Sequence, residues 1–382
     1  MTMEHNSSTH PLLPPTTEDQ RFDWLRLLRS RRVGIATFYR LMGEYGSARA
    51  ALDHLPGVAR DAGVENYQIC PEGVVQAEFR AAKAVGARML CRGDTDYPAA
   101  LLDLDDAPPI LWATGHPGIV LRPRIALVGA RNASSLGGRM ARALAGGLGE
   151  AGFVIVSGMA RGVDTAAHMA ALDTGTIAVL GGGVDVLYPA ENSKLAEDIV
   201  ANGGLRLSEQ PVGLQPQARH FPARNRIISG MSQAVIVVEA AAKSGSLITA
   251  RTALDQGRDV MAVPGHPFDA RASGCNLLLR DGARLVRNCD DVIEALGPLV
   301  APAAEPPPAQ LPLEPPTPQR SLAEVARLHQ KILDRLGPSP LGEDQLIRDL
   351  GATSRTVSPA LTDLELDGRI RREPGGLIAL RA

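Results

Sequence analysis

Seven short apolar runs between Arg124 and Leu296 alternate with segments of helical pattern. The runs cover residues 125–130, 153–158, 176–183, 205–209, 234–240, 259–265 and 283–288. Each run is apolar throughout and rich in Val and Ile, which is typical of strands buried on both faces of a parallel sheet. Between them, apolar residues recur at helical spacing, as at Met140, Leu144 and Leu148. The alternation predicts a Rossmann-like, doubly wound and mostly parallel α/β domain over residues 124–296.

The part of the chain before this domain has a different pattern. Residues 1–19 are polar and contain proline, so they predict a disordered tail. The segments FDWLRLL, VGIATFYRLMGEYG and ARAALDHL then predict short helices, separated by glycines, in a small helical domain over residues 20–90. Its pattern suits a SAM-like or helix-hairpin-helix-like domain that either contacts a DNA backbone or only packs; we favour packing. Residues 91–123 are predicted to be a connector that packs on the core.

A proline-rich linker precedes the last segment. Residues 297–320 contain nine prolines, so this stretch predicts a semi-extended linker and a separate domain beyond it. Residues 321–382 predict two helices, a third helix with Val357, Leu361 and Leu364 on one face, and a Gly-Gly hairpin. This order predicts a winged-helix domain.

Composition limits the possible partners. The 382 residues carry 40 Lys and Arg against 42 Asp and Glu, so any site for a nucleic acid must be local rather than a global basic field. The four cysteines form no C-x-x-C pair, as expected in a reducing compartment. A signal-peptide pattern and an apolar stretch of 18 residues are both missing from the sequence, so we expect a cytoplasmic protein without membrane contact.

Candidate chemistry lies in the loops after the predicted strands, where doubly wound sheets bind ligands. The segment GARNASSLGGR offers Arg131 and a Ser cap at a helix start, which together predict an anion site. The segment SGMARGVDTAAH repeats the pattern with Arg161, although Asp164 as a helix cap and His168 as a packed residue are the simpler interpretations.

Two further loops strengthen the same prediction. No acidic residue occurs between Glu209 and Glu239, whereas HFPARNRIISG and the residue before it bring several basic groups: Arg219, His220, Arg224 and Arg226. The run AVIVVEA then leads into AKSGSLITA, where Lys243 meets a helix start. Four such loops on one sheet edge favour phosphate binding.

Enzyme motifs are missing from the sequence. It contains no G-x-x-x-x-G-K-[ST] loop, no G-x-S-x-G elbow and no histidine pair at metal-ligand spacing. A binding role without catalytic residue, cofactor or metal is therefore the simpler interpretation.

Eight blocks of residues 124–288 resemble the DprA/Smf family of DNA-processing proteins, in the same order. They are GARNASSLG, SGMARGVDTAAH, GGGVDVLYPAEN, SEQP, FPARNRIISG, VVEAAAKSGSLITARTAL, VPGHP and SGCNLLLRDGA. The helical start and winged-helix end also look like that family. The resemblance implies a protein of natural transformation that binds and protects incoming single-stranded DNA, forms a homodimer through the Rossmann-like domain and helps to load the RecA recombinase.

The resemblance also implies a set of phosphate-binding residues. They are Gly129, Arg131, Ser134, Arg161, Arg224, Asn225, Lys243, Ser244 and Gly245. The chain departs from the family pattern at Ala130, where a Ser is usual, and at Leu136, where an aromatic residue is common. The first change removes one hydroxyl but leaves Gly129 and Arg131 in place.

Three functions remain to be separated. With 3% aromatic residues, the chain has too few rings for a stacking platform, so we expect a single-strand binder to hold phosphates without regard to base sequence. The alternative is a Rossmann-like nucleotide-binding or nucleoside-monophosphate-cleaving enzyme that uses Glu239, although the P-G-G-x-G-T-x-x-E signature of such enzymes is missing from the sequence.

A third possibility is a duplex-binding regulator that uses the winged helix. The third helix of that domain is acidic, with Asp363, Glu365 and Asp367, which favours a protein-interaction or regulatory module. Counter-evidence comes from three basic residues near the wing: Arg369, Arg371 and Arg372.

Overall fold

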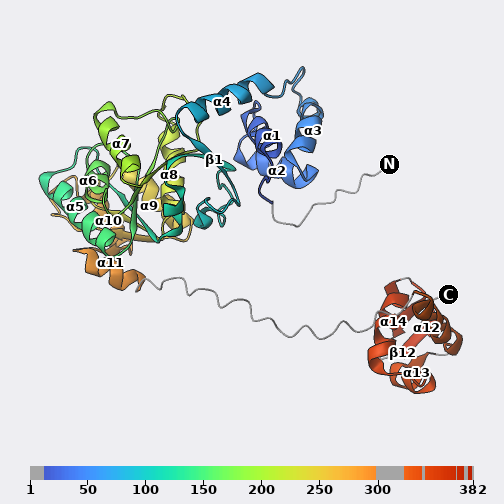
Figure 1. The fold of residues 1–382 in the computed structure, drawn as a ribbon. Coiled ribbons are helices and arrows are strands. Elements are labelled where there is room, and N and C mark those ends of the chain that lie inside the picture. The colour runs from blue at the N-terminus through green and yellow to red at the C-terminus, as the bar shows by residue number, and fades with distance from the viewer. Residues whose placement is uncertain (1–12, 298–321, 338–339, 367, 374–376, 381–382) are drawn as a thin grey trace. The chain divides into compact units, whose positions relative to one another are not determined.

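The computed structural model describes residues 13–297, 322–337, 340–366, 368–373 and 377–380 (Figure 1). The chain forms two compact units, Met1–Val300 and Ala301–Ala382. The predicted tail up to residue 12, the predicted linker from residue 298 to 320 and the predicted Gly-Gly turn lie outside the described residues. The first helix begins at Glu18, two residues inside the predicted tail.

A nine-stranded sheet forms the centre of the first unit. Its strands lie in the order β1-β2-β6-β5-β4-β3-β7-β8-β9. Seven of them are parallel: β3 (Arg124–Val128), β4 (Val154–Ser157), β5 (Thr176–Val179), β6 (Leu205–Ser208), β7 (Ala234–Val237), β8 (Asp259–Ala262) and β9 (Arg284–Leu285). The predicted doubly wound domain is thus confirmed. Most strands end before the predicted runs do, because glycines and polar residues at their ends turn the chain into loops.

Two antiparallel strands at one sheet edge were not predicted. β1 (Arg88–Cys91) pairs with β2 (Ile110–Gly115), and β2 pairs with β6. They fall within the segments expected to be the end of the helical domain and a connector, so this part of the chain extends the sheet. Trp112 on β2 is buried and donates a 2.8 Å hydrogen bond to Glu78 Oε1, which ties the strand to the helices before it.

Helices cover both faces of the parallel strands. Apolar side chains of α8 (His220–Gly230), α9 (Gly245–Asp255) and α10 (Ser273–Arg280) share one core with the sheet. Those of α5 (Ser135–Glu150), α6 (Val163–Ala170) and α11 (Cys289–Leu296) share a second core on the other face. α7 (Ser193–Ala201) packs on β5 and β6. The helices therefore leave the carboxyl ends of the strands to the connecting loops.

The N-terminal helices form a core of their own that reaches the sheet edge. They are α1 (Glu18–Arg29), α2 (Ile35–Tyr45), α3 (Ala48–Asp61) and α4 (Glu72–Ala84). Thr17 and Gln20 make reciprocal hydrogen bonds at the start of α1, which is a capping box. Trp24, Phe38 and Leu52 pack in one cluster with Ile110 and Trp112 of β2. The helical domain is thus packed against the antiparallel edge.

The second unit has the predicted winged-helix elements. They are α12 (Leu322–Arg335), β10 (Leu341–Gly342), α13 (Glu343–Asp349), α14 (Ser354–Leu366), β11 (Ile370–Glu373) and β12 (Leu377–Leu380). Val357, Leu361 and Leu364 of α14 are buried in its core, as their spacing predicted. β11 and β12 pair antiparallel as the two strands of the wing.

Candidate functional site

The strand order reverses direction at β3. From β3 the chain proceeds through β4, β5 and β6 on one side, and then returns to place β7, β8 and β9 on the other. The carboxyl ends of β3 and β7 lie side by side at this switch point, where doubly wound sheets form a crevice. A cavity of about 700 Å³ lies there, and we call it the switch-point cavity. Its lining includes Gly129, Arg131, Asn132, Ala160, Asp164, Phe221, Arg224, Asn225, Lys243, Ser244, Gly245, Ser246 and Arg271.

Three exposed cationic side chains belong to this lining. Arg131 comes from the loop after β3, Lys243 from the loop after β7 and Arg271 from the loop after β8. The guanidinium of Arg131 lies 5.4 Å from the ring centre of Phe221 at the start of α8. Because the three cations come from neighbouring loops, an anion in the cavity would meet positive charge from several directions.

The start of α9 provides an open helix N-terminus in the same cavity. Ser244 is the N-cap of this helix, and its Oγ accepts a 3.3 Å hydrogen bond from the Ser246 amide. A Cβ atom added to Gly245 would have no atom within 4 Å. Backbone amides and the helix dipole favour negative charge at such a position. The placement of Ser244, Gly245 and Lys243 is therefore suited to a phosphate.

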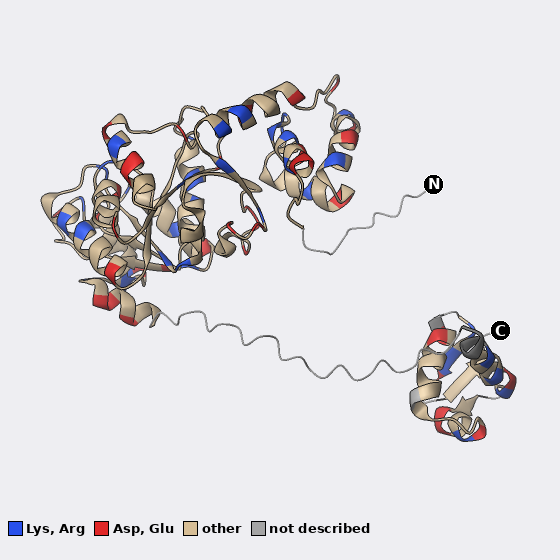
Figure 2. Cartoon of the chain, viewed as in Figure 1, with Lys and Arg blue, Asp and Glu red and all other residues tan. Residues whose placement is uncertain are grey.

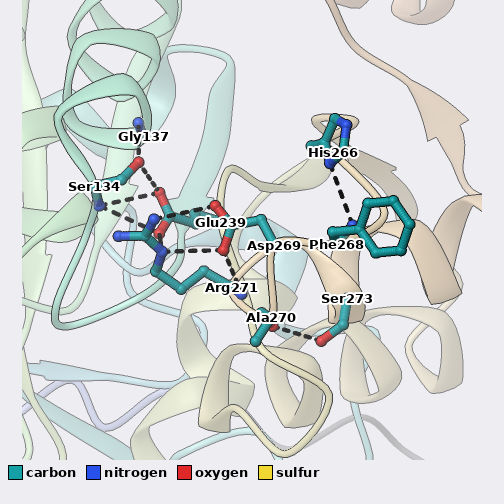
Figure 3. A network of polar contacts seen from close by, with 9 residues as sticks. All are labelled: Ser134, Gly137, Glu239, His266, Phe268, Asp269, Ala270, Arg271 and Ser273. Atoms are coloured by element: carbon teal, nitrogen blue, oxygen red, sulfur yellow. Dashed lines mark hydrogen bonds and ion pairs between the residues drawn. The ribbon is translucent and has the colours of Figure 1, made fainter.

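The start of α5 is different, because a side chain of the protein already occupies it (Figure 3). Glu239 is buried and accepts hydrogen bonds from the Ser134 amide at 3.1 and 3.2 Å and from Ser134 Oγ at 2.7 Å. Ser134 Oγ in turn accepts a 2.9 Å hydrogen bond from the Gly137 amide. The anion at this helix start is thus a carboxylate of the chain. The hydroxyl of Ser134 caps α5, as its place before the helix predicted, and it is already hydrogen-bonded to Glu239.

In the loop after β4, backbone amides are likewise hydrogen-bonded to a carboxylate of the chain. Asp164 is buried near the start of α6, and its Oδ2 accepts hydrogen bonds from the amides of Gly158 at 3.1 Å and Ala160 at 3.2 Å. Burial raises the pKa of this carboxyl, while the nearby guanidinium of Arg224 lowers it. Arg161 is exposed, forms a 3.6 Å ion pair with Glu191 and does not line the cavity. The residues beside it do reach the other predicted residues, because Ala160 lines the cavity and the Val163 amide donates a 3.2 Å hydrogen bond to the Ala130 carbonyl oxygen.

Arg224 lies in the cavity floor and is almost fully buried. Its Nη1 donates hydrogen bonds of 2.5 Å to the carbonyl oxygens of Gly158 and Val179, at the ends of β4 and β5. Burial is the main cause that lowers its pKa to about 10, so the guanidinium stays charged at neutral pH. Arg224 therefore holds two loops in place and adds positive charge beneath Arg131.

The basic stretch of the sequence is divided by the fold. Arg219 is exposed, whereas Arg226 is partly buried and paired with Glu209 and, at 3.4 Å, with Asp106. His220 is buried at the start of α8, and burial lowers its pKa. Asn225 is half-buried and lines the cavity. A count of basic residues could not distinguish those that face the cavity from those that hold α8 to neighbouring elements.

Arg271 and Phe221 line the cavity but were not predicted as site residues. Arg271 pairs with Asp269 at 3.1 Å and lies 3.7 Å from Glu239 (Figure 3). The available signal was its position in the loop after β8, next to β7 in the sheet. Phe221 had no such signal, because its contact with Arg131 depends on how α8 packs.

Other features of the described residues are weaker candidates for a binding site. A hollow of about 1,010 Å³ between α1 and β1 is lined by Arg21, Lys83 and Arg88, but also by Glu18, Asp94 and Asp96, so its charges balance. Figure 2 shows basic and acidic residues together on several helices, in agreement with the near balance of 40 Lys and Arg against 42 Asp and Glu in the whole chain. No cluster of three or more potential metal ligands occurs in the parts that the structure describes. Within those same parts, no helix has the length and apolar character to cross a membrane.

Comparison with known proteins identifies three family regions. Residues 88–297 match the family of DNA recombination-mediator protein A. Residues 18–81 match the DprA-like N-terminal HHH domain, and residues 302–376 match the DprA winged helix domain. Together the matches cover the helical domain, the sheet and the winged helix.

Relatives in other bacteria are similar over much of the chain. DNA processing protein DprA of Streptococcus pneumoniae is 48% identical over 202 residues, which cover 52% of this chain and 71% of that protein. Protein Smf of Escherichia coli is 37% identical over 294 residues, with 75% of each chain covered.

Solved structures agree with these matches. The structure of DprA from S. pneumoniae is 35% identical, with a TM-score of 0.53 and coverage of 69% of this chain and 98% of that one. DprA from Helicobacter pylori, whose structure was described for its single-stranded DNA binding mode, is 32% identical, with a TM-score of 0.51 and coverage of 55% and 95%. The family regions, the relatives and the shared fold agree, and the chain belongs to the DprA/Smf family of DNA-processing proteins.

Proposed function

We propose that this protein binds single-stranded DNA through its phosphates at the switch-point cavity and acts as a recombination mediator. The observation that carries the proposal is the grouping of Arg131, Lys243 and Arg271 around the open start of α9. Gly129, Asn225, Ser244 and Gly245 complete the proposed contact surface. Arg224 and Ser134 support this surface through their hydrogen bonds to neighbouring loops, and Arg161 follows Ala160 of the cavity lining without lining the cavity itself.

The relatives support the same proposal. The family is that of recombination-mediator proteins, and the H. pylori relative is described as binding single-stranded DNA. Gly129 lines the same cavity, although its lack of a side chain is explained by internal packing, because an added Cβ would lie 2.6 Å from Val163 Cγ2.

The test is a salt-dependent binding assay with poly-dT and with duplex DNA. For single strands, the logarithm of the binding constant falls with the logarithm of salt concentration with a slope of about −0.7 per neutralised phosphate. We expect tighter binding to poly-dT, and slopes shallower by about 0.7 in Arg131→Ala and in Lys243→Ala. Arg60→Ala, on α3, is the matched control for an exposed arginine. Unchanged slopes in both cavity variants would contradict the proposal.

A binding role without catalysis is part of the proposal. The carboxylate that the enzyme alternative requires is Glu239, and this group is buried, accepts hydrogen bonds from Ser134 and is absent from the cavity lining. Incubation with nucleoside monophosphates is expected to release no base. Base release that disappears in Glu239→Gln would favour the enzyme.

We also propose that the winged helix serves a protein partner instead of duplex DNA. Two basic residues of the wing are neutralised: Arg371 pairs with Glu373 at 2.9 Å, and Arg372 pairs with Glu343 and Glu365 at 3.1 Å. These ion pairs weaken the argument that the basic residues of the wing bind duplex DNA. A truncated chain that ends at residue 297 should keep its preference for single strands over duplex.

Homodimer formation, RecA loading and a cytoplasmic location complete the proposal. Light scattering during size-exclusion chromatography should give twice the 40.3 kDa mass of one chain. RecA loading predicts that the protein shortens the lag before RecA hydrolyses ATP on single strands covered by a single-strand-binding protein. A monomeric mass would contradict the proposed homodimer, and an unchanged lag would contradict the proposed RecA loading.

A further inference from the structure

Two aromatic rings stand out by their exposure. Each of the six Phe, five Tyr and two Trp residues lies in the described parts of the chain. Among them, the exposed rings are Tyr188, with 54% of its surface accessible, and Phe268, with 94%. Both belong to loops that follow strands at the carboxyl edge of the sheet, the edge that carries the switch-point cavity.

Tyr188 is continuous with the cavity wall. Its ring centre lies 6.0 Å from that of Phe221. Phe221 lines the cavity and lies beneath the guanidinium of Arg131, at 5.4 Å from its ring centre. An exposed ring, a lining ring and a phosphate-binding cation therefore form one connected surface.

Phe268 is the more exposed of the two rings. It belongs to the compact loop between β8 and α10, whose Arg271 lines the cavity. The ring of His266 lies 5.6 Å from the ring of Phe268, and His266 Nδ1 accepts a 3.3 Å hydrogen bond from the Phe268 amide (Figure 3). The Asp269 amide donates a 2.9 Å hydrogen bond to the His266 carbonyl oxygen. Hydrogen bonds within the loop thus fix its backbone, and the ring of Phe268 is exposed to solvent.

The order of the strands places the cations between the two rings. Tyr188 follows β5 and Phe268 follows β8, while β4, β3 and β7 lie between them. Four strand spacings correspond to about 19 Å along the sheet edge. Arg131 and Lys243 follow β3 and β7, two of the three strands in between. In the order of the strands, the loops with these two cations thus lie between the loops with the two rings.

We propose that nucleobases of the bound single strand stack on Tyr188 and Phe268, one at each end of the switch-point cavity. This inference rests on the proposed function. Every base has an apolar face that stacks on an aromatic ring, and an unpaired strand leaves its bases free to do so. The sequence argued against stacking because aromatic residues are few, but the fold gathers the exposed rings at the cationic edge.

The test separates bases from phosphates. Binding is measured for a dT oligonucleotide and for an abasic oligonucleotide of equal length, which has the same backbone charge and no bases. Stacking on one ring contributes about 1–3 kcal/mol per base, or roughly 5- to 150-fold in affinity. We expect Phe268→Ala and Tyr188→Ala each to weaken dT binding at least about fivefold while abasic binding stays unchanged.

Matched variants complete the design. Phe268→Trp keeps a stacking surface and should retain dT affinity, and Val74→Ala on α4 removes an exposed apolar side chain from the helical domain without effect. Equal loss for both strands, no loss, or loss in only one of the two alanine variants would overturn the arrangement. A wild-type protein that binds neither strand would instead refute the proposed function, as would binding without the salt dependence described above.

Discussion

Glu239 Oε2 lies 2.7 Å from Ser134 Oγ, across 105 positions of the sequence. This hydrogen bond joins the loop after β7 to the start of α5. It places a carboxylate of the chain where helix geometry favours an anion. The start of α9 differs, because its cap is the hydroxyl of its own Ser244, which lines the switch-point cavity.

Glu239→Ala should destabilise the fold. The substitution leaves the partly buried amide of Ser134 without its acceptor and removes the charge that stabilises the start of α5. We expect the free energy of unfolding to fall by about 2 kcal/mol. Urea denaturation measures the change. Glu150→Ala, at the exposed C-terminal end of the same helix, is the control and should stay near the wild-type value.

Two glycines of α5 should respond to alanine in opposite directions. A Cβ at Gly137 would lie 1.9 Å from Glu239 Oε2, whereas one at Gly146 would have no atom within 4 Å. Gly137→Ala must displace the Glu239 carboxylate, so we expect a loss of about 1–3 kcal/mol. Gly146→Ala should gain up to about 1 kcal/mol from helix propensity. Thermal unfolding of both variants checks the pair, and equal shifts would contradict the described contact.

Asp269→Asn should strengthen binding to single strands. The Asp269 carboxylate pairs with Arg271, which holds the pKa of Asp269 below its usual range and offsets the cation at the cavity. Removing the charge frees Arg271 for phosphate and should raise affinity by up to about fivefold, because an exposed ion pair is weak. Fluorescence anisotropy with poly-dT measures the affinity. Asp173→Asn, exposed after α6, controls for the general gain in net charge.

Stability should fall with acid through the titration of His168. Burial, with the nearby charge of Arg224, lowers the pKa of this imidazole from 6.5 to about 3. Thr176 Oγ1 donates to the Ile155 carbonyl oxygen, so it accepts from neutral His168 Nδ1 at 2.7 Å. Between pH 6.5 and about 3 the unfolded chain binds the proton and the folded chain does not. This contribution to stability is therefore complete above pH 6.5 and is lost as pH falls.

The slope for one such group reaches about 1.4 kcal/mol per pH unit. Urea midpoints between pH 7 and pH 4 are the measurement. His168→Gln keeps a donor toward Thr176 without this titration, so its stability should vary less steeply with pH over this window. Parallel pH profiles for the two proteins would show that His168 is not the source.

Much of the fold could be predicted from local sequence patterns. The alternation of Val- and Ile-rich runs with helical spacing indicated a parallel sheet, because strands buried on both faces must be apolar throughout. β1 and β2 were missed, because the two faces of β2 are buried by different parts of the chain: Trp112 packs with α1–α4, whereas Leu111 lies in the core that includes α8. The local sequence pattern does not show which distant segments bury the two faces of a strand.

For the candidate site, the sequence by itself determined which loops carry the cations, because the loops after parallel strands meet at one edge. It also determined that Lys243 and Gly245 stand at a helix start. Only the tertiary structure decided which of these groups is free. Packing joined Glu239 to Ser134, buried Arg224 beneath the loops and paired Arg226 with Glu209, while Tyr188 and Phe268 stayed exposed. The physical reason is that a charge or a ring is available to a ligand only where distant segments of the chain have not already taken it as a partner.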